Sequence, residues 1–251
     1  MDDPHHHHRR ALAISLLASL LLWNLPAGGV LMYPFKLLAT WIHEMSHGLV
    51  MLAGGAGFSH LEIYRDTSGI AYAEAGATRA WRAAIASAGY MGTAAVGGVL
   101  LVVGQTMRGA RGVLAAMAVA LGLSAALWIR NDFGVWVAIA GSSALLASSL
   151  FLRSAHATFL VNFVAAQACI HAVLDIRVLF RANLVVDGEV VRNSDAHNMA
   201  AASFGPAWMW AALWLLWSFA VFFVALRVAY VRQAGPIGSP PAEAPPADSG
   251  R

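Results

Sequence analysis

Three residues with clear chemical potential, His43, Glu44 and His47, form a His-Glu-x-x-His motif. Residues four apart lie on the same face of a helix, so both imidazoles can bind one metal ion. Glu44 is displaced from His43 by about 100° around the helix and can reach a water molecule held by that metal. Imidazole nitrogen is a zinc ligand, and a carboxylate beside zinc-bound water can move its proton. The motif therefore predicts a zinc-dependent hydrolytic centre.

The residues around the motif are almost wholly apolar. Two histidines and a glutamate can occur on a helix by chance, where they simply cap or pack. Here the motif lies between the apolar segments 37–42 and 48–53. A charged side chain at the centre of a membrane helix costs about 2.5–3.5 kcal/mol to insert. Three ionisable side chains so close together in such a segment favour a functional site over a chance pattern.

Composition places the whole chain in a membrane. The sequence has 251 residues, of which 59% are hydrophobic and 12% charged, and this predicts an all-α polytopic membrane protein. Basic residues are scattered with no continuous stripe, so nucleic acid is excluded as a partner. Cys169 is the only cysteine, which excludes an intrachain disulfide. We expect the partners to be the lipid bilayer and a membrane protein substrate, with homo-oligomerisation left open.

Seven apolar stretches predict a bundle of about six or seven transmembrane helices. They are residues 11–26, 30–53, 81–104, 112–129, 134–152, 158–180 and 207–230. The expected transmembrane domain is thus 11–230, with an N-terminal tail 1–10 and a Pro/Ala/Ser-rich tail 231–251 predicted to be disordered. His5–His8 is either a remnant of a purification tag or a native metal-binding tract.

Two features between the predicted helices concern packing and substrate. Residues 58–73 alternate polar and apolar side chains around a polar turn, which predicts a small β-hairpin after the motif helix. Non-helical backbone at membrane depth requires protein or water beside it, so we expect the hairpin at the mouth of a cavity. Its open edge can pair with an extended substrate segment, although an ordinary surface hairpin is the alternative. The small residues 87–92 and 97–98 predict close helix contact.

A catalytic zinc site has three protein ligands and a water molecule, so the motif needs a third ligand. Gln167, His171 and Asp175 are spaced by four and form one polar stripe on an apolar predicted helix. We expect Asp175 to be the ligand, with His171 or Gln167 orienting it or lining the substrate groove. Alternatively, Asp175 pairs with an arginine at the helix end.

Other carboxylates are candidates for the same role. Asp195 and His197, in the polar loop 181–206, can reach the metal if that loop folds back into the cavity. Asp132 is a weaker candidate because Arg130 lies beside it in the sequence and balances its charge.

Together these residues resemble those of the site-2 proteases, which are intramembrane zinc metallopeptidases, and in particular the small bacterial branch of that family. The resemblance rests on His43-Glu44-x-x-His47-Gly48, the Gly54-Gly55 turn, the hairpin and Ala88-Gly89-Tyr90-Met91-Gly92. It implies that His43 and His47 bind Zn²⁺ and that Glu44 is the general base and acid. The second family motif has Asn and Pro ahead of Leu-Asp-Gly, and here only Leu174-Asp175 matches it, with Ile176 in place of the glycine and without the proline.

We therefore expect a zinc metalloendopeptidase that hydrolyses membrane-embedded or membrane-proximal proteins by metal-activated water. Its expected location is the bacterial inner membrane, as a multi-pass protein. The alternatives are an inactive membrane zinc protein that binds transmembrane segments, and a metal-ion transporter. Internal repeats are typical of transporters, and a glutamate directly after the first histidine is typical of hydrolases.

Overall fold

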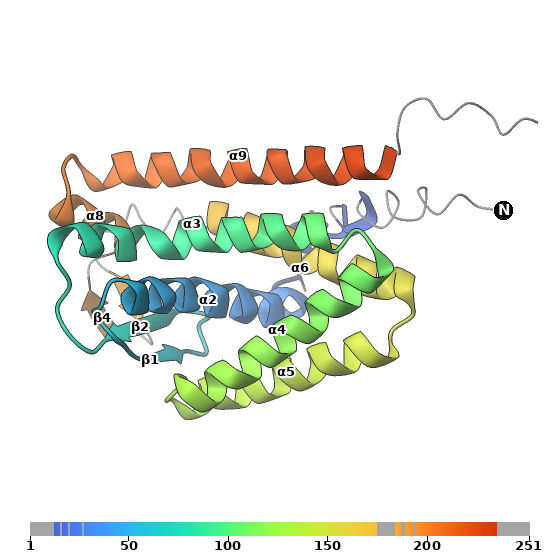
Figure 1. Cartoon of the computed structure of the whole chain (residues 1–251), viewed down its shortest axis with the longest axis horizontal. Helices are drawn as coiled ribbons and strands as arrows, with labels where there is room; N and C mark the ends of the chain where they lie inside the picture. The colour runs from blue at the N-terminus through green and yellow to red at the C-terminus, as the bar shows by residue number, and fades with distance from the viewer. Residues whose placement is uncertain are drawn as a thin grey trace, which may run out of the picture.

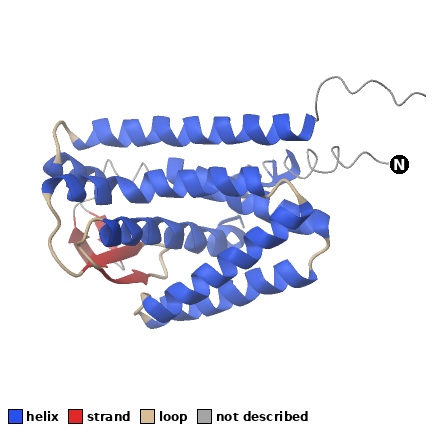
Figure 2. Cartoon of the chain, in the orientation of Figure 1, coloured by secondary structure: helices blue, strands red, loops and turns tan. Residues whose placement is uncertain are grey.

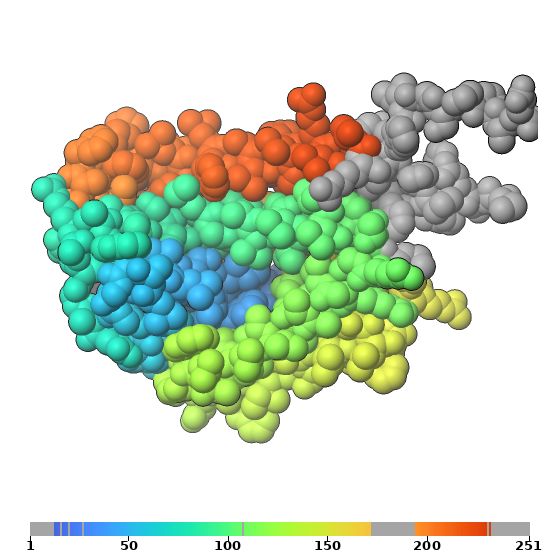
Figure 3. Space-filling view, in the orientation of Figure 1, coloured from blue at the N-terminus to red at the C-terminus, as the bar shows by residue number. Residues whose placement is uncertain are grey.

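The computed structural model describes residues 13–15, 17–19, 21–26, 28–174, 184–186, 189–192 and 194–234. Its main elements are helices, as predicted: α2 (Gly28–Ala53), α3 (Arg79–Val103), α4 (Met107–Leu127), α5 (Asp132–Phe151), α6 (Ser154–Leu174), α8 (Asp195–Ala202) and α9 (Ala207–Ala234). Helix α3 lies at the centre of the bundle, where it packs against α2, α6, α8 and α9 (Figure 1). Helix α9 extends along the outside of α3 (Figure 3).

Each apolar stretch that was predicted as a helix contains one in the structure. Within the described residues, four helices are long and apolar enough to cross a membrane: α3, α4, α5 and α9. A fifth span arises if Ala13–Asn24 and α2, which meet at a bend of 117°, are counted as one. The predicted tail 1–10 and residues 235–251 lie outside the described residues. The tail 231–251 was predicted to be disordered, but its first four residues belong to α9, which continues to Ala234.

Glycines on α3 allow the neighbouring helices to approach closely. A Cβ atom on Gly97 would lie 2.7 Å from the Cys169 sulfur of α6, and one on Gly98 would lie 2.8 Å from Val221 of α9. Neither position has room for a larger residue without a shift of the neighbouring helix. The close helix contact predicted from the small residues is confirmed at these positions.

The predicted hairpin is present as β1 (Phe58–Ile63) and β2 (Gly69–Ala73), an antiparallel pair beside the C-terminal end of α2 (Figure 2). The Leu61 N–H donates to the Trp128 carbonyl at 2.9 Å, and the Arg130 N–H donates to the Leu61 carbonyl at 3.2 Å. The Asn131 side chain bonds both the N–H and the carbonyl of Ile63. The outer edge of β1 is therefore occupied, and no strand among the described residues pairs with the other edge of β2.

A second hairpin, which was not predicted, lies in the polar loop. It consists of β3 (Leu184–Val186) and β4 (Glu189–Arg192). The short helix α8 follows it and packs against both α3 and α9. The described part of the polar loop thus folds back against the bundle, which is the condition under which Asp195 or His197 was expected to reach the metal.

Candidate metal centre

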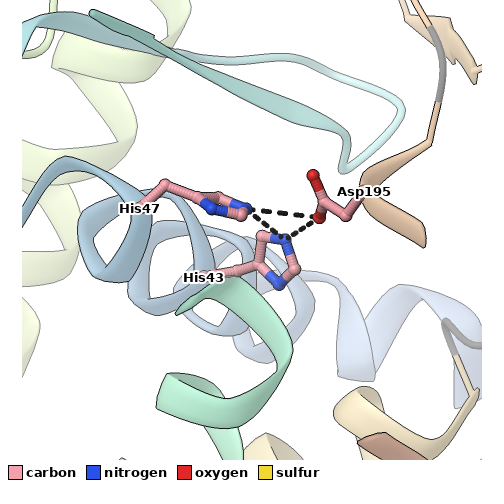
Figure 4. Close-up of side chains that lie close together, drawn as sticks. All are labelled: His43, His47 and Asp195. Atoms are coloured by element: carbon pink, nitrogen blue, oxygen red, sulfur yellow. Dashed lines mark hydrogen bonds and ion pairs between the residues drawn. The ribbon is translucent and has the colours of Figure 1, made fainter. Parts of the chain in front are cut away.

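His43 and His47 lie one helical turn apart on α2 and point toward the same place as Asp195, the first residue of α8 (Figure 4). The two Nε2 atoms are 3.0 Å apart. The Asp195 Oδ2 atom lies 3.2 Å from the Nε2 of His43 and 3.3 Å from that of His47. Residues separated by about 150 positions in the sequence therefore present three donor atoms to one point.

These distances match what a zinc ion requires. Ligands at about 2.0–2.1 Å with tetrahedral angles are separated from one another by about 3.3 Å. The three observed separations, 3.0, 3.2 and 3.3 Å, are close to that value. Two imidazole nitrogens and one carboxylate oxygen also form a donor set of the kind found in catalytic zinc sites, which leave a fourth position open. The group can hold a zinc ion.

The tautomer of His47 explains why a cation is needed here. Its Nδ1–H donates a hydrogen bond to the Ile85 carbonyl oxygen of α3 at 2.6 Å. In the neutral ring this bond leaves a lone pair on Nε2, and that lone pair faces the His43 ring and the Asp195 carboxylate. A lone pair and a carboxylate oxygen repel each other unless a proton or a metal ion lies between them. A proton carried by the histidines or a metal ion bound by all three residues satisfies this arrangement.

The site is buried on the α2 side and more open at Asp195. The side-chain exposed fractions are 7% for His47, 18% for His43 and 24% for Asp195. Burial acts to raise the pKa of the Asp195 carboxyl, but the attraction of protonated His47 and the hydrogen bonds from His43 and His47 outweigh it and hold this pKa below its ordinary range. Asp195 is consequently an anion at neutral pH, the form that binds metal.

Glu44 lies between the histidines and the hairpin. Its side chain is buried, and its carboxylate accepts a hydrogen bond from the Ala71 backbone of β2. Gly69, at the start of β2, lies so close that a Cβ there would be 2.8 Å from the Glu44 Cγ. One turn earlier on α2, the Thr40 hydroxyl donates to the Thr67 carbonyl in the turn of the hairpin, at 2.6 Å. These contacts hold β2 beside the carboxylate.

Two residues of α3 complete the walls of the site. A Cβ on Gly89 would lie 2.3 Å from the Nε2 of His43 and 2.4 Å from the Nε2 of His47. Only glycine therefore leaves room for both imidazoles. The Tyr90 ring packs edge-on against His43 at 4.7 Å between centroids and stacks on Trp214 of α9 at 5.5 Å. The Tyr90 ring thus restricts the orientation of the His43 ring, as the hydrogen bond to the Ile85 carbonyl restricts that of the His47 ring.

The remaining sequence-predicted residues are placed as follows. Asp175 lies outside the described residues, so its predicted role stays a prediction. Gln167 of α6 bonds the Trp23 indole at 3.1 Å and the Ser19 hydroxyl at 2.7 Å. His171 of α6 is buried, and neither it nor Gln167 is part of the three-donor group found among the described residues.

The two other residues weighed as ligands also lie outside that group. His197 bonds the Ser194 hydroxyl through Nδ1 at 2.8 Å. Asp132 is the first residue of α5, where a carboxylate is favourable at the positive end of the helix dipole.

Ile85, Gly89 and Tyr90 were not predicted as part of the site. The sequence did hint at Gly89 and Tyr90, because the small residues 87–92 predicted close contact between this helix and a neighbour. That neighbour at Gly89 is the pair of imidazole rings. The Ile85 contribution is a backbone carbonyl, which no side-chain pattern can reveal.

Comparison with protein families matches residues 12–225 to the family described as Peptidase M50B-like. This range covers most of the chain and includes the His-Glu-x-x-His motif and Asp195. The chain therefore belongs to the M50B-like peptidases, within the site-2 protease family, which confirms the resemblance seen in its motifs. It is an integral membrane protein of a protease family. No curated protein and no solved structure matches it.

Proposed function

We propose that the chain is a zinc-dependent endopeptidase that cleaves membrane-embedded or membrane-proximal proteins, in a bacterial inner membrane. The observation that carries the proposal is the convergence of His43, His47 and Asp195, where the Ile85 hydrogen bond turns the Nε2 atom of His47 toward the other two donor atoms. Family membership supports the same chemistry. Glu44 directly follows the first histidine and supplies the carboxylate that peptide hydrolysis requires.

Metal binding, proton transfer and orientation of the base are assigned to different residues. His43, His47 and Asp195 would hold Zn²⁺, which lowers the pKa of a bound water to about 7 and polarises the scissile carbonyl. Glu44 takes the proton from the attacking water and later delivers it to the leaving amine. The Ala71 backbone keeps the Glu44 carboxylate oriented between these two transfers.

The open edge of β2 gives the substrate a place beside Glu44. Leu61 of β1 directs its N–H and its carbonyl toward residues 128–130. Ala71 is its antiparallel partner, so this is a pair without mutual hydrogen bonds, and the polar groups of Ala71 point away from β1, where the Ala71 N–H is bonded to the Glu44 carboxylate. An extended segment that adds to β2 is thus brought next to Glu44. A transmembrane helix has to unwind locally to be cut there, because its peptide groups are otherwise bonded within the helix.

The experiment reconstitutes the chain in liposomes with a panel of single-span proteins and follows cleavage by mass spectrometry. The unaltered chain should cut at least one of them, and Glu44→Gln should not, although it still binds zinc. Glu74→Gln, an exposed glutamate just beyond the hairpin, is the matched control and should cut normally. Equal cutting by the Glu44→Gln and unaltered chains would refute the proposed role of Glu44.

Two other outcomes correspond to the alternative functions. Stoichiometric binding of single-span proteins without cleavage by any version would indicate an inactive zinc protein. Zinc flux into the liposomes that is lost in His47→Ala would indicate a transporter.

A further inference from the structure

We infer that Arg79 is a positioning residue that sets the place of Asp195 in the metal centre, by holding the far end of α8. The inference rests on the proposed zinc site and names a residue outside it. Arg79 is the first residue of α3, and α8 is the helix that begins with Asp195.

The contacts of Arg79 are directed at the C-terminal end of α8. Its Nε–H donates to the Ala202 carbonyl at 2.9 Å, and its Nη2 donates to the Ser203 carbonyl at 2.7 Å. Ala202 is the last residue of α8 and Ser203 is its C-cap. Carbonyls at the end of a helix have no partner within it and carry the negative end of its dipole. A guanidinium with two parallel donors therefore fixes this end in both position and direction.

Fixing one end of α8 fixes the other because the helix is short and regular. Its eight residues span about 10 Å from Asp195 to Ala202. A helix of this length is unstable by itself and takes its stability from its contacts. Apolar packing also anchors α8, where Ala196 and Met199 join a cluster with Tyr90 and Trp214, and the Ser87 hydroxyl lies 3.7 Å from the Met199 sulfur. Apolar contacts allow sliding, whereas the two hydrogen bonds of Arg79 do not.

The same helix, α3, thus places all three donor atoms relative to one another. Its Ile85 carbonyl orients His47, and its Gly89 admits both imidazole rings. Arg79, six residues before Ile85, locates the helix that carries Asp195. Zinc tolerates ligand displacements of only about 0.2 Å, so a loose α8 weakens the site even when its residues are unchanged.

A second arginine provides a matched control. The Arg111 guanidinium of α4 donates to the Leu152 carbonyl, the C-cap of α5, at 2.8 Å. It therefore caps a helix end by the same chemistry as Arg79. Helix α5 carries no residue of the metal centre. Arg111→Ala removes a helix-capping arginine without affecting the metal centre. Arg79→Ala removes a capping arginine and also the contact that positions Asp195.

The test uses the full chain with His5–His8 deleted, in detergent, and measures zinc affinity by chelator competition. Arg79→Ala should bind zinc about 10–100-fold more weakly, the usual effect of removing a group that orients a ligand. The zinc affinity of Arg111→Ala should stay within about twofold of that of the unaltered chain. Arg79→Lys should recover part of the loss, because its ammonium group can still donate to a carbonyl at the end of α8. In an Asp195→Ala background, Arg79→Ala should cause no further loss, since both changes remove the same ligand.

Amide hydrogen exchange of the zinc-free protein gives an independent readout. Residues 195–202 should exchange faster in Arg79→Ala than in the unaltered chain or in Arg111→Ala. Equal zinc affinity in Arg79→Ala and Arg111→Ala would overturn the inference, as would an equal additional loss in the Asp195→Ala background. Absence of zinc binding by the unaltered chain would refute the proposed function. In that case, amide exchange of α8 that is the same in Arg79→Ala and the unaltered chain would separately overturn the role of Arg79. If Arg79→Ala does not fold, Arg79→Lys answers both measurements.

Discussion

Replacement of Gly89 by alanine tests the geometry of the site with a single methyl group. The new Cβ would lie 2.3 Å from the Nε2 of His43 and 2.4 Å from the Nε2 of His47. Ordinary contact begins at 3.4 Å, so both rings have to move by about 1 Å. Zinc ligands tolerate only about 0.2 Å. We expect zinc affinity to fall by at least about 100-fold, beyond the effect usual for groups that merely orient a ligand.

The same substitution has a small effect on folding. Alanine is favoured over glycine within a helix by about 0.8–1.0 kcal/mol, and this offsets part of the strain from crowding, which is typically about 1–3 kcal/mol. The unfolding free energy should therefore change by no more than about 2 kcal/mol. Metal binding and stability are thus expected to separate in this variant.

The assay is chelator competition for zinc, with denaturant unfolding of the zinc-free protein measured in parallel. Gly112→Ala in α4 is the control, because its Cβ would meet no atom within 4 Å. It should bind zinc as the unaltered chain does. Unaltered zinc affinity in Gly89→Ala would refute the reasoning, because the imidazoles could not then face α3 as they do in the structure.

Three further substitutions follow from the contacts described. Glu44→Gln should retain zinc but lower the rate of peptide cleavage by about 10²–10⁴-fold, and loss of zinc together with activity would contradict a purely proton-transfer role. Asn131→Ala leaves the N–H and carbonyl of Ile63 without their side-chain partner, so the unfolding free energy should fall by about 1–3 kcal/mol; unchanged stability in denaturant would count against this anchor of the hairpin. Gly48→Ala places a Cβ 2.3 Å from the Phe58 ring and should destabilise the chain by about 1–3 kcal/mol, whereas Gly29→Ala, with open space around it, should not.

Local patterns were the part of the structure that the sequence predicted well. The helices follow from long apolar runs, and the hairpin follows from alternation in a polar segment. The relation between His43 and His47 needs only the four-residue repeat of one helix. The observed hairpin departs from strict alternation because its register shifts between Phe58 and His60. Such a shift depends on how the strand packs against its neighbours, which the strand sequence does not encode.

The third donor, Asp195, is the part of the site that the sequence did not favour. Periodicity favoured Asp175, because it continues a polar stripe along one helix. The structure brings Asp195 to the histidines instead of leaving it in a loop, through the folding of α8 against α3 and α9. His43 and Asp195 are 152 positions apart, and no local repeat links them. Their meeting depends on small side chains such as Gly89 and on backbone partners such as Ile85, which gain meaning only once the helices are packed.

The most direct test is the zinc content of the purified chain with His5–His8 deleted, compared among His47→Ala, Asp195→Ala and Asp175→Ala. Deleting the four histidines removes a second source of metal binding. We expect about one zinc per unaltered chain, lost in His47→Ala and Asp195→Ala and kept in Asp175→Ala. Zinc kept in Asp195→Ala but lost in Asp175→Ala would contradict the proposed centre and assign the third ligand to Asp175.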